Sequence, residues 1–360
     1  MLKIALVHDY LTQYGGAERV LEVLAGMFPE APIYTLLYDE KATGRVFKKR
    51  DVRTSFLQKI PFSRRHHRWF PLLMPIAIEQ FDLGEFDVVL SISHSFAKGI
   101  ITKPHTKHIN YCLTPPRFLW DDSHRYIGEF NLPWSVRKLL PFVLSYLRIW
   151  DKEASYRVDE YVAISQFVRA RVKKYYEHDA QVIYPPVDTK KYFISERLDD
   201  YFLMVGRLVA YKRFDLAVKA FSVMGLPLKI VGDGPEYRKI KNQISNVKNI
   251  KLLGLVSDYK LPGIYAKAQA VIFPQEEDFG IVPLEAMASG RPVIAYRAGG
   301  ALETIVNGET GIFFDQQTEI DICEAVGKFR RVSWDPQRIK EQAMKFDVAL
   351  FIEKIKNLVY

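Results

Sequence analysis

The chain has 360 residues, of which 48% are hydrophobic, 26% charged and 13% aromatic, and its formal net charge is +9. This composition excludes a disordered tail and a collagen-like or low-complexity scaffold, and the length favours two domains. No apolar run approaches the roughly 18 residues that span a bilayer.

Short apolar runs alternate with amphipathic stretches from the N-terminus onward. In the first half they predict a helix over residues 16–28 and strands over 3–8, 33–38, 86–93 and 108–113. Continuously apolar strands interleaved with helices are typical of parallel sheets covered on both faces. The first half is therefore predicted to be an α/β domain.

The second half repeats this alternation more clearly. It predicts strands over 201–205, 228–231, 250–255 and 270–273, and helices over 214–224, 235–244 and 257–267.

The segment Tyr184-Pro185-Pro186-Val187-Asp188 separates the two halves. Two prolines remove successive backbone donors, so this segment fits neither a helix nor a central strand. We predict one domain over 1–183 and a second over 184–336. A helix at about 337–360 is expected to pack back on the first domain.

Basic residues are concentrated in one part of the first half. Residues 45–68 contain nine Lys and Arg against one acid, Asp51, and the run continues as Trp69-Phe70-Pro71-Leu72-Leu73-Met74. The pattern fits either an interfacial segment on an anionic membrane or a solvated loop with a buried anchor. No nucleic-acid recognition module is present, so a nucleic-acid partner is not expected. Two separated cysteines, Cys112 and Cys323, favour a reducing, cytoplasmic compartment and predict no metal site.

The turns that follow the predicted strands carry the unusual residues. After the first strand, Gly15 and Gly16 open a helix, which is either an anion-binding turn or an ordinary helix entry. The pattern is not the dinucleotide fingerprint, which argues against a Rossmann dehydrogenase. After residues 201–205, Arg207 and Lys212 are two cations suited to a diphosphate, unless they are ordinary surface charges.

The most informative turn follows the strand at 270–273. Three acidic residues at 276–278 precede a Phe279-Gly280 turn and a helix that starts at about Ile281, and a helix start presents N–H groups to a phosphate. Helix capping explains Glu277 or Asp278.

Capping does not explain Glu285, which lies within the first two turns of the helix. Together with Glu277, it provides two carboxylates that can accept hydrogen bonds from sugar hydroxyls.

Glu277-x7-Glu285, with Gly206-Arg207-x4-Lys212 upstream, resembles the donor site of family 4 glycosyltransferases of the GT-B fold. The resemblance covers nearly the whole chain, and it is similar in particular to the mannosyltransferase branch of polysaccharide and O-antigen assembly. Further motifs carry the resemblance: Val7-His8-Asp9-Tyr10, Gly15-Gly16-Ala17-Glu18-Arg19, Ser93-His94, Tyr111-Cys112-Leu113-Thr114-Pro115 and Gly299-Gly300-Ala301-Leu302-Glu303-Thr304.

The resemblance implies two Rossmann-like domains with parallel sheets facing a central cleft. The domain over 1–183 would bind the acceptor, and the domain over 184–336 would bind the nucleotide sugar. It implies a retaining transfer of a hexosyl group from a nucleotide-diphosphate sugar, with GDP-mannose favoured, and neither cofactor nor metal. The acceptor would be a glycan or a polyprenyl-diphosphate-linked glycan in surface polysaccharide biosynthesis. The enzyme would then be cytoplasmic, with an anionic inner-leaflet surface as a further expected partner.

The resemblance also implies roles for single residues. Arg207 and Lys212 would neutralise the diphosphate, Glu285 would hold the ribose, and Glu277 would hold the donor sugar. His94 would reach that sugar near the reaction centre, unless it caps the next helix. The backbone N–H groups of five residues would complete the phosphate cradle: Gly15, Gly16, Phe279, Gly280 and Ile281.

The sequence departs from the family pattern at one position, and two alternative functions remain open. Relatives usually carry His where this chain has Leu113, which suggests a different acceptor. The alternatives are a GT-B transferase that uses a UDP-sugar, and a non-catalytic protein that binds nucleotide sugars or polyanions.

Overall fold

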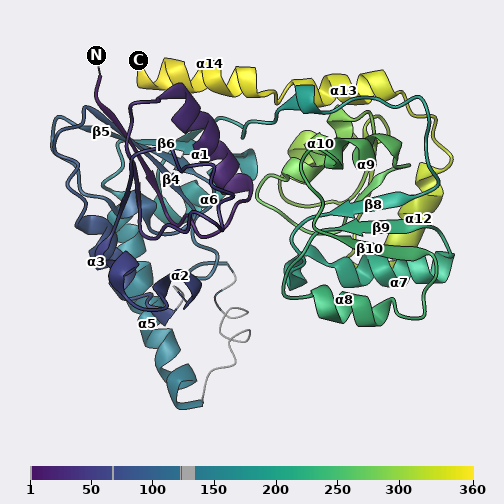
Figure 1. The fold of residues 1–360 in the computed structure, drawn as a ribbon, viewed down its shortest axis with the longest axis horizontal. Helices are drawn as coiled ribbons and strands as arrows, with labels where there is room; N and C mark the ends of the chain where they lie inside the picture. The colour runs from purple at the N-terminus through teal and green to yellow at the C-terminus, as the bar shows by residue number, and fades with distance from the viewer. Residues whose placement is uncertain (1, 67–68, 122, 124–133) are drawn as a thin grey trace. The chain divides into compact units, whose positions relative to one another are not determined.

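The computed structural model describes residues 2–66, 69–121, 123 and 134–360. They form two compact units, one comprising residues 2–184 and Lys354–Tyr360, the other Pro185–Glu353. Each unit has its own parallel sheet and its own hydrophobic core (Figure 1). The prediction of two α/β units is thus confirmed.

In the described part of the first unit, seven strands form one sheet in the order β3-β2-β1-β4-β5-β6-β7, and all neighbours pair in parallel. The strands are β1 (Ile4–His8), β2 (Ile33–Thr35), β3 (Val52–Thr54), β4 (Val88–Ser93), β5 (Lys107–Cys112), β6 (Glu160–Ala163) and β7 (Ala180–Val182). The helices are α1 (Gly16–Met27), α2 (Ser63–His66), α3 (Leu73–Glu79), α5 (Trp134–Ser155) and α6 (Gln166–Tyr176).

In the second unit, six strands form a parallel sheet in the order β10-β9-β8-β11-β12-β13. The strands are β8 (Phe202–Val205), β9 (Leu228–Val231), β10 (Ile250–Gly254), β11 (Val271–Phe273), β12 (Val293–Tyr296) and β13 (Gly311–Phe314). The helices are α7 (Phe214–Met224), α8 (Tyr237–Gln243), α9 (Leu261–Lys267), α10 (Ile281–Ala288), α11 (Ala301–Thr304), α12 (Glu319–Phe329), α13 (Pro336–Met344) and α14 (Val348–Val359). Of these, α13 packs against α10, and the end of α14 belongs to the first unit.

The structure differs from the sequence-based elements mainly at the edges of the first sheet. The strand predicted over 33–38 ends at Thr35, and β3, β6 and β7 were not predicted. The edge strand β3 is Val52-Arg53-Thr54, which is half exposed and lacks an apolar run. The edge strand β7 contains an exposed Gln181. Edge strands need no continuous burial, so their sequences carry a weak signal.

A buried ion pair joins α5 to the loop that follows β4. Lys98 and Asp151 are 1% and 0% exposed, and the Lys98 ammonium contacts the Asp151 carboxylate. The same carboxylate accepts hydrogen bonds from Trp120 Nε1 at 2.9 Å and from the Tyr176 hydroxyl at 2.8 Å. Lys98 Nζ also donates to the carbonyl of Ser95 at 3.1 Å. One carboxylate therefore connects four segments of the first unit.

Replacing Asp151 by Asn is expected to destabilise the protein by about 3–5 kcal/mol, because the Lys98 ammonium would remain buried without a counter-charge. Urea unfolding of the full chain measures this loss. Glu160→Gln is the control, since its pair with Lys107 is partly exposed and contributes about 1 kcal/mol or less. If Asp151→Asn lowers the free energy of unfolding no more than Glu160→Gln does, the pair of Lys98 and Asp151 is not the stabilising contact described above.

Candidate active site

The candidate residues lie in both units, and each group is described within its own unit. In the first unit they follow the carboxyl ends of β1 and β4, which are neighbours in the sheet. Parallel strands bring their carboxyl ends to one edge of a sheet, and ligands of α/β folds bind at such edges. His8 is the last residue of β1, Asp9 follows it, and His94 follows β4 directly.

Asp9 organises this edge. Its carboxylate is fully buried and accepts hydrogen bonds from the backbone N–H groups of His94, Phe96 and Ala97, at 2.7, 2.7 and 2.6 Å. His94 Nδ1 lies 2.9 Å from Asp9 Oδ2. Burial alone raises the pKa of Asp9, but the charge and hydrogen bonds of His94 outweigh it and hold that pKa well below its usual range. Asp9 is therefore ionised and holds the loop after β4 in place. The sequence alone indicated no role for it.

The position of Asp9 also defines the state of His94. A carboxylate beside Nδ1 favours a proton on that nitrogen and holds the ring in one orientation. The His94 side chain is 39% exposed. The next helical turn, Ala97–Gly99, has Phe96 as its N-cap residue, and its first amides donate to Asp9. His94 is thus not the cap of that turn.

The Gly15-Gly16 turn begins α1, as predicted. Its first amide, the N–H of Gly15, donates to Glu18 Oε2 at 2.7 Å and is therefore occupied in this structure. Glu18 is 1% exposed, and its Oε1 lies 3.7 Å from Nε2 of the fully buried His8. Burial raises the pKa of Glu18, but the neighbouring His8 outweighs this effect and holds that pKa below its ordinary value. A phosphate role for Gly16 stays a prediction, and the Gly15 amide would first have to leave Glu18.

In the second unit the candidate residues follow β8 and β11, which are also neighbours. Lys212 Nζ lies 2.8 Å from Glu277 Oε1, and the two side chains are 13% and 18% exposed. Burial lowers the pKa of Lys212, but the charges of Glu277 and Glu285 raise it above its ordinary value. The structure thus pairs Lys212 with Glu277, two residues that the sequence singled out, and the ammonium stays protonated.

The remaining predicted residues of this unit differ in exposure. Arg207 is exposed, whereas Phe279 is 3% exposed. Gly280 has a φ of 92° and is the N-cap residue of α10, which begins at Ile281. The first N–H groups of a helix have no intrahelical partner, so those of α10 lie just beyond the acidic loop. Glu285 is 4% exposed and accepts a hydrogen bond from the Tyr265 hydroxyl at 2.8 Å.

Two further residues of this edge were not found from the sequence. Tyr265 on α9 is fully buried and holds Glu285. Gln275 is 2% exposed, donates to Glu277 Oε1 at 3.2 Å, and has a side-chain oxygen without a hydrogen-bond partner in the structure. A polar residue that ends a buried strand is the signal that could have identified Gln275.

Glycines let the loops of this edge approach closely. A Cβ at Gly232 would lie 1.9 Å from the carbonyl oxygen of Gly206, so the turn after β9 packs directly on the turn that carries Arg207. A Cβ at Gly300 would lie 2.3 Å from the Cα of Phe279, and the Gly300 N–H donates to the Glu277 carbonyl at 2.9 Å. The loop with Glu277 is therefore supported by the loop after β12.

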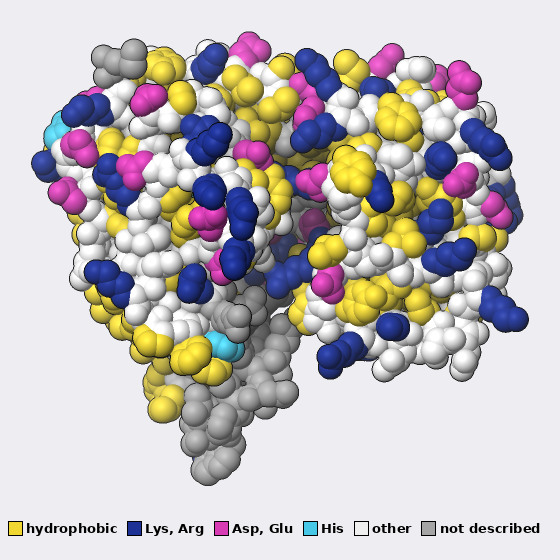
Figure 2. Space-filling model, viewed as in Figure 1, with side chains coloured by type: hydrophobic (Ala, Val, Ile, Leu, Met, Phe, Trp, Pro, Cys, Tyr) yellow, Lys and Arg dark blue, Asp and Glu magenta, His cyan; other side chains and the backbone are white. Residues whose placement is uncertain are grey.

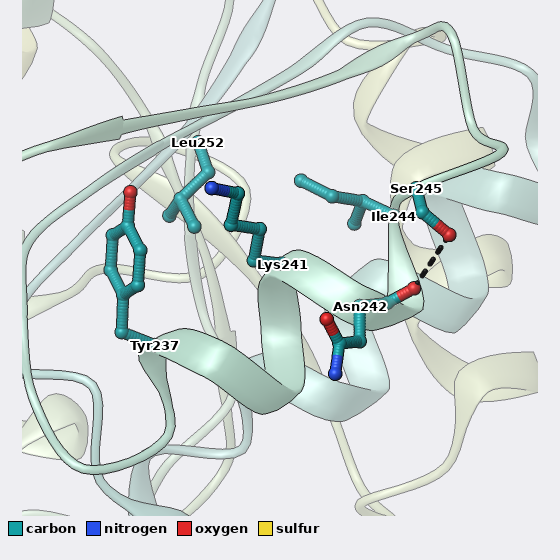
Figure 3. A pocket seen from close by; sticks show the side chains of 6 residues that line it. All are labelled: Tyr237, Lys241, Asn242, Ile244, Ser245 and Leu252. Atoms are coloured by element: carbon teal, nitrogen blue, oxygen red, sulfur yellow. Dashed lines mark hydrogen bonds between the residues drawn. The ribbon is translucent and has the colours of Figure 1, made fainter.

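A separate hollow of about 360 Å³ lies between α8 and β10 and contains none of the predicted site residues (Figure 3). Its lining residues are Tyr237, Lys241, Asn242, Ile244, Ser245 and Leu252. Within the described ranges, no three His, Cys, Asp or Glu side chains are grouped as ligands of a metal ion.

Two protein-family models match this chain, one in each half. The model "Glycosyltransferase Family 4" matches residues 14–191, and the model "Glycosyl transferases group 1" matches residues 189–346. Solved structures share the fold over nearly the full length of both chains. HepE of Anabaena in complex with UDP and glucose aligns with a TM-score of 0.72 and 19% identity, covering 100% of this chain and 99% of HepE.

Curated relatives are more similar in sequence over shorter segments. An uncharacterized glycosyltransferase of Methanocaldococcus jannaschii is 30% identical over 50% of this chain and 52% of its own. A GDP-mannose-dependent phosphatidylinositol monomannoside mannosyltransferase of Mycobacterium tuberculosis is 30% identical over 46% of this chain and 51% of its own. The matched segment thus spans about half the length of each. The α-1,3/1,6-mannosyltransferase ALG2 of Dictyostelium discoideum is 25% identical over 99% of this chain and 98% of its own.

Asp9→Asn is expected to lower the free energy of unfolding by about 2 kcal/mol or more at pH 7, because charged hydrogen bonds to three buried amides are weakened. A carboxylate with a depressed pKa stabilises the fold above its unfolded pKa, near 4, and loses that effect as the pH falls toward its folded pKa. The difference between wild type and variant should therefore narrow between pH 5 and pH 3. Urea unfolding of both proteins at pH 7, 5 and 3 measures this difference in the free energy of unfolding. A difference that grows toward pH 3 would contradict the ionised state of Asp9.

Proposed function

Since this chain belongs to glycosyltransferase family 4 and has the GT-B fold, we propose that it transfers a mannosyl group from GDP-mannose with retention of configuration. The proposed acceptor is a glycan, free or polyprenyl-diphosphate-linked, in surface polysaccharide biosynthesis. Two mannosyltransferases among the relatives support the donor sugar, and one of them is described as GDP-mannose-dependent.

The observation that carries the proposal is the ion pair of Lys212 and Glu277 on the turns that follow β8 and β11, with the charge of Glu285 on α10 also acting on the ammonium. Breaking the bond between sugar and diphosphate leaves negative charge on phosphate oxygens. Preorganised cations and helix N-termini stabilise such charge without reorganising, which is usually the largest catalytic contribution. We propose that Lys212, Arg207 and the start of α10 do this, so that no metal is required.

The two carboxylates have different surroundings, which suits different tasks. Glu285 is buried and held by Tyr265, so its position is defined, and we propose that it binds the ribose hydroxyls. Glu277 lies on the loop, paired with Lys212, and we propose that it binds hydroxyls of the donor sugar. Since an ammonium has three donors, Lys212 can keep Glu277 in place while it contacts the diphosphate.

His94 is proposed to act on the donor sugar beside the bond that breaks. Its Asp9 partner is ionised and fixes the ring, which is the arrangement expected of a positioned polar group. Leu113 is half-buried and its N–H donates to the Ser93 carbonyl at 2.8 Å, one residue from His94. We propose that the apolar Leu113 contributes to the choice of acceptor.

A UDP-sugar donor is the second candidate, and the HepE structures with UDP and with UDP-glucose support it. The two donors share the diphosphate and differ in the base. Any base pocket at the turns after β9 and β10 would use mainly backbone groups, since Gly232 and Gly234 have no side chain. Measured nucleotide preference therefore decides between them.

We expect GDP and GDP-mannose to raise the thermal unfolding temperature, because a ligand at 100 times its Kd stabilises by about 2.7 kcal/mol. Lys212→Ala should abolish this shift and lower kcat/KM by about 10²- to 10³-fold. Lys219→Ala, which removes an exposed lysine of α7, is the matched control. A shift with UDP species alone would contradict GDP-mannose as the donor. No shift with any nucleotide would contradict the proposal that this protein binds a nucleotide sugar.

Proton NMR of the product formed from GDP-mannose tests the stereochemistry. Retention predicts an α-linked mannosyl product, at an undiminished rate in excess EDTA because the cations come from Arg207, Lys212 and α10. A β-linked product would refute retention, and loss of turnover with EDTA would refute the proposed metal independence.

A further inference from the structure

Helix α5 is apolar on two faces, and only one of them is used by the core. Leu144 and Leu147 are 4% and 0% exposed and pack in the core of the first unit. On another face, four large apolar side chains are more than half exposed: Leu139 at 62%, Phe142 at 75%, Tyr146 at 54% and Ile149 at 66%. A spacing of three, four and three residues places these four on one stripe, about 15 Å long. This set is named the α5 stripe.

A second exposed apolar group lies on the segment that includes α2 and α3. It consists of Phe62 at 76%, Trp69 at 68%, Leu72 at 44% and Ile76 at 48% exposure. The end of α3 is joined to α5, because Trp150 Nε1 donates to Glu79 Oε1 at 2.8 Å. Figure 2 shows hydrophobic side chains gathered along the border of the first unit where Figure 1 draws α3 and α5.

The structure divides the run at residues 69–74, for which the sequence left open an interfacial segment or a solvated loop with a buried anchor. Met74 is 1% exposed, and Phe70 and Leu73 pack against the core, so they serve as the buried anchor. Trp69 and Leu72 point to solvent. His67 and Arg68 lie outside the described residues. The buried-anchor alternative therefore holds for Phe70, Leu73 and Met74, and the membrane alternative stays a prediction for the exposed Trp69 and Leu72.

Cations accompany these apolar groups. Lys59 and Arg64 are exposed on either side of Phe62, and Lys48 and Lys49 are exposed earlier in the same run. Lys48 lies 3.8 Å from Glu40, a distance that leaves its charge only partly compensated. Exposed cations beside aromatic and aliphatic side chains match the composition of surfaces that bind anionic lipid headgroups.

We propose that the α5 stripe, with Phe62, Trp69, Leu72 and Ile76, inserts shallowly into a bilayer rich in anionic lipid. A second copy of this chain fits less well, since it would bring the same cations together and each chain already carries a net charge of +9. Among the described residues, no helix has both the length and the apolarity to span a bilayer. The contact is therefore interfacial, and its purpose rests on the proposed function, because a lipid-linked acceptor would be found at this surface.

Vesicle co-sedimentation of the full chain tests the proposal with two compositions, phosphatidylcholine alone and phosphatidylcholine with 30% phosphatidylglycerol. Wild type should bind the anionic vesicles about tenfold or more tightly than the neutral ones, and high salt should weaken this preference. Phe142→Glu/Ile149→Glu should reduce binding to anionic vesicles by about tenfold or more. Lys59→Gln/Arg64→Gln should reduce only the part that depends on anionic lipid.

The matched control is Val223→Glu/Ile320→Glu, which adds two charges at exposed apolar positions of the second unit, 81% and 67% exposed. Equal losses in the control and the Phe142/Ile149 variant would overturn the proposal, as would no binding by wild type or equal binding to neutral vesicles. Sedimentation velocity without lipid is run on the same proteins. Wild-type self-association that the Phe142/Ile149 variant abolishes would assign the surface to a second copy.

The same variants are also tested for nucleotide-induced thermal shifts without lipid. A protein that binds anionic vesicles and no nucleotide would contradict the proposed function and leave the surface assignment intact. A protein that binds GDP or UDP species and no vesicles would do the reverse.

Discussion

The buried carboxylate of Asp9 is the constraint on which the first unit's site depends. The loop after β4 has three backbone N–H groups that its own residues do not satisfy, and Asp9, directly after the neighbouring strand β1, accepts all three. An ionised group can stay buried only with such partners. The amides of the loop therefore keep Asp9 charged. Asp9 in turn keeps His94 in one position beside the end of β1.

The second unit contains a buried cation in place of a buried anion. Lys212 is largely buried, yet Glu277 and Glu285 keep it charged. The loop that carries Glu277 is supported by backbone contacts at Gly300, where a side chain would not fit. In both units, backbone geometry thus places charged groups just after the carboxyl ends of parallel strands. This position suits a phosphorylated ligand.

The sequence predicted the parts of this protein that depend on periodicity and turn chemistry. Continuous apolar runs located the central strands, residue types after the strands singled out Lys212 and Glu277, and the family resemblance singled out His94. It missed β3 and β7, which are edge strands without apolar runs, and it missed Tyr265, whose role depends on α9 lying beside α10. It could not separate Met74 from Trp69, because the two share an apolar character and differ only in which side of the segment faces the core.

The buried pair of Lys98 and Asp151 has a consequence for the order in which the protein matures on the ribosome. Its members are 53 residues apart, and the lysine is made first. Until α5 has left the exit tunnel, the Lys98 ammonium has no counter-charge and stays in water, because burying it alone is costly. The loop that begins at His94 therefore reaches its final packing only after the chain has been synthesised past Asp151, so nascent fragments that end earlier contain β4 without a finished active-site loop.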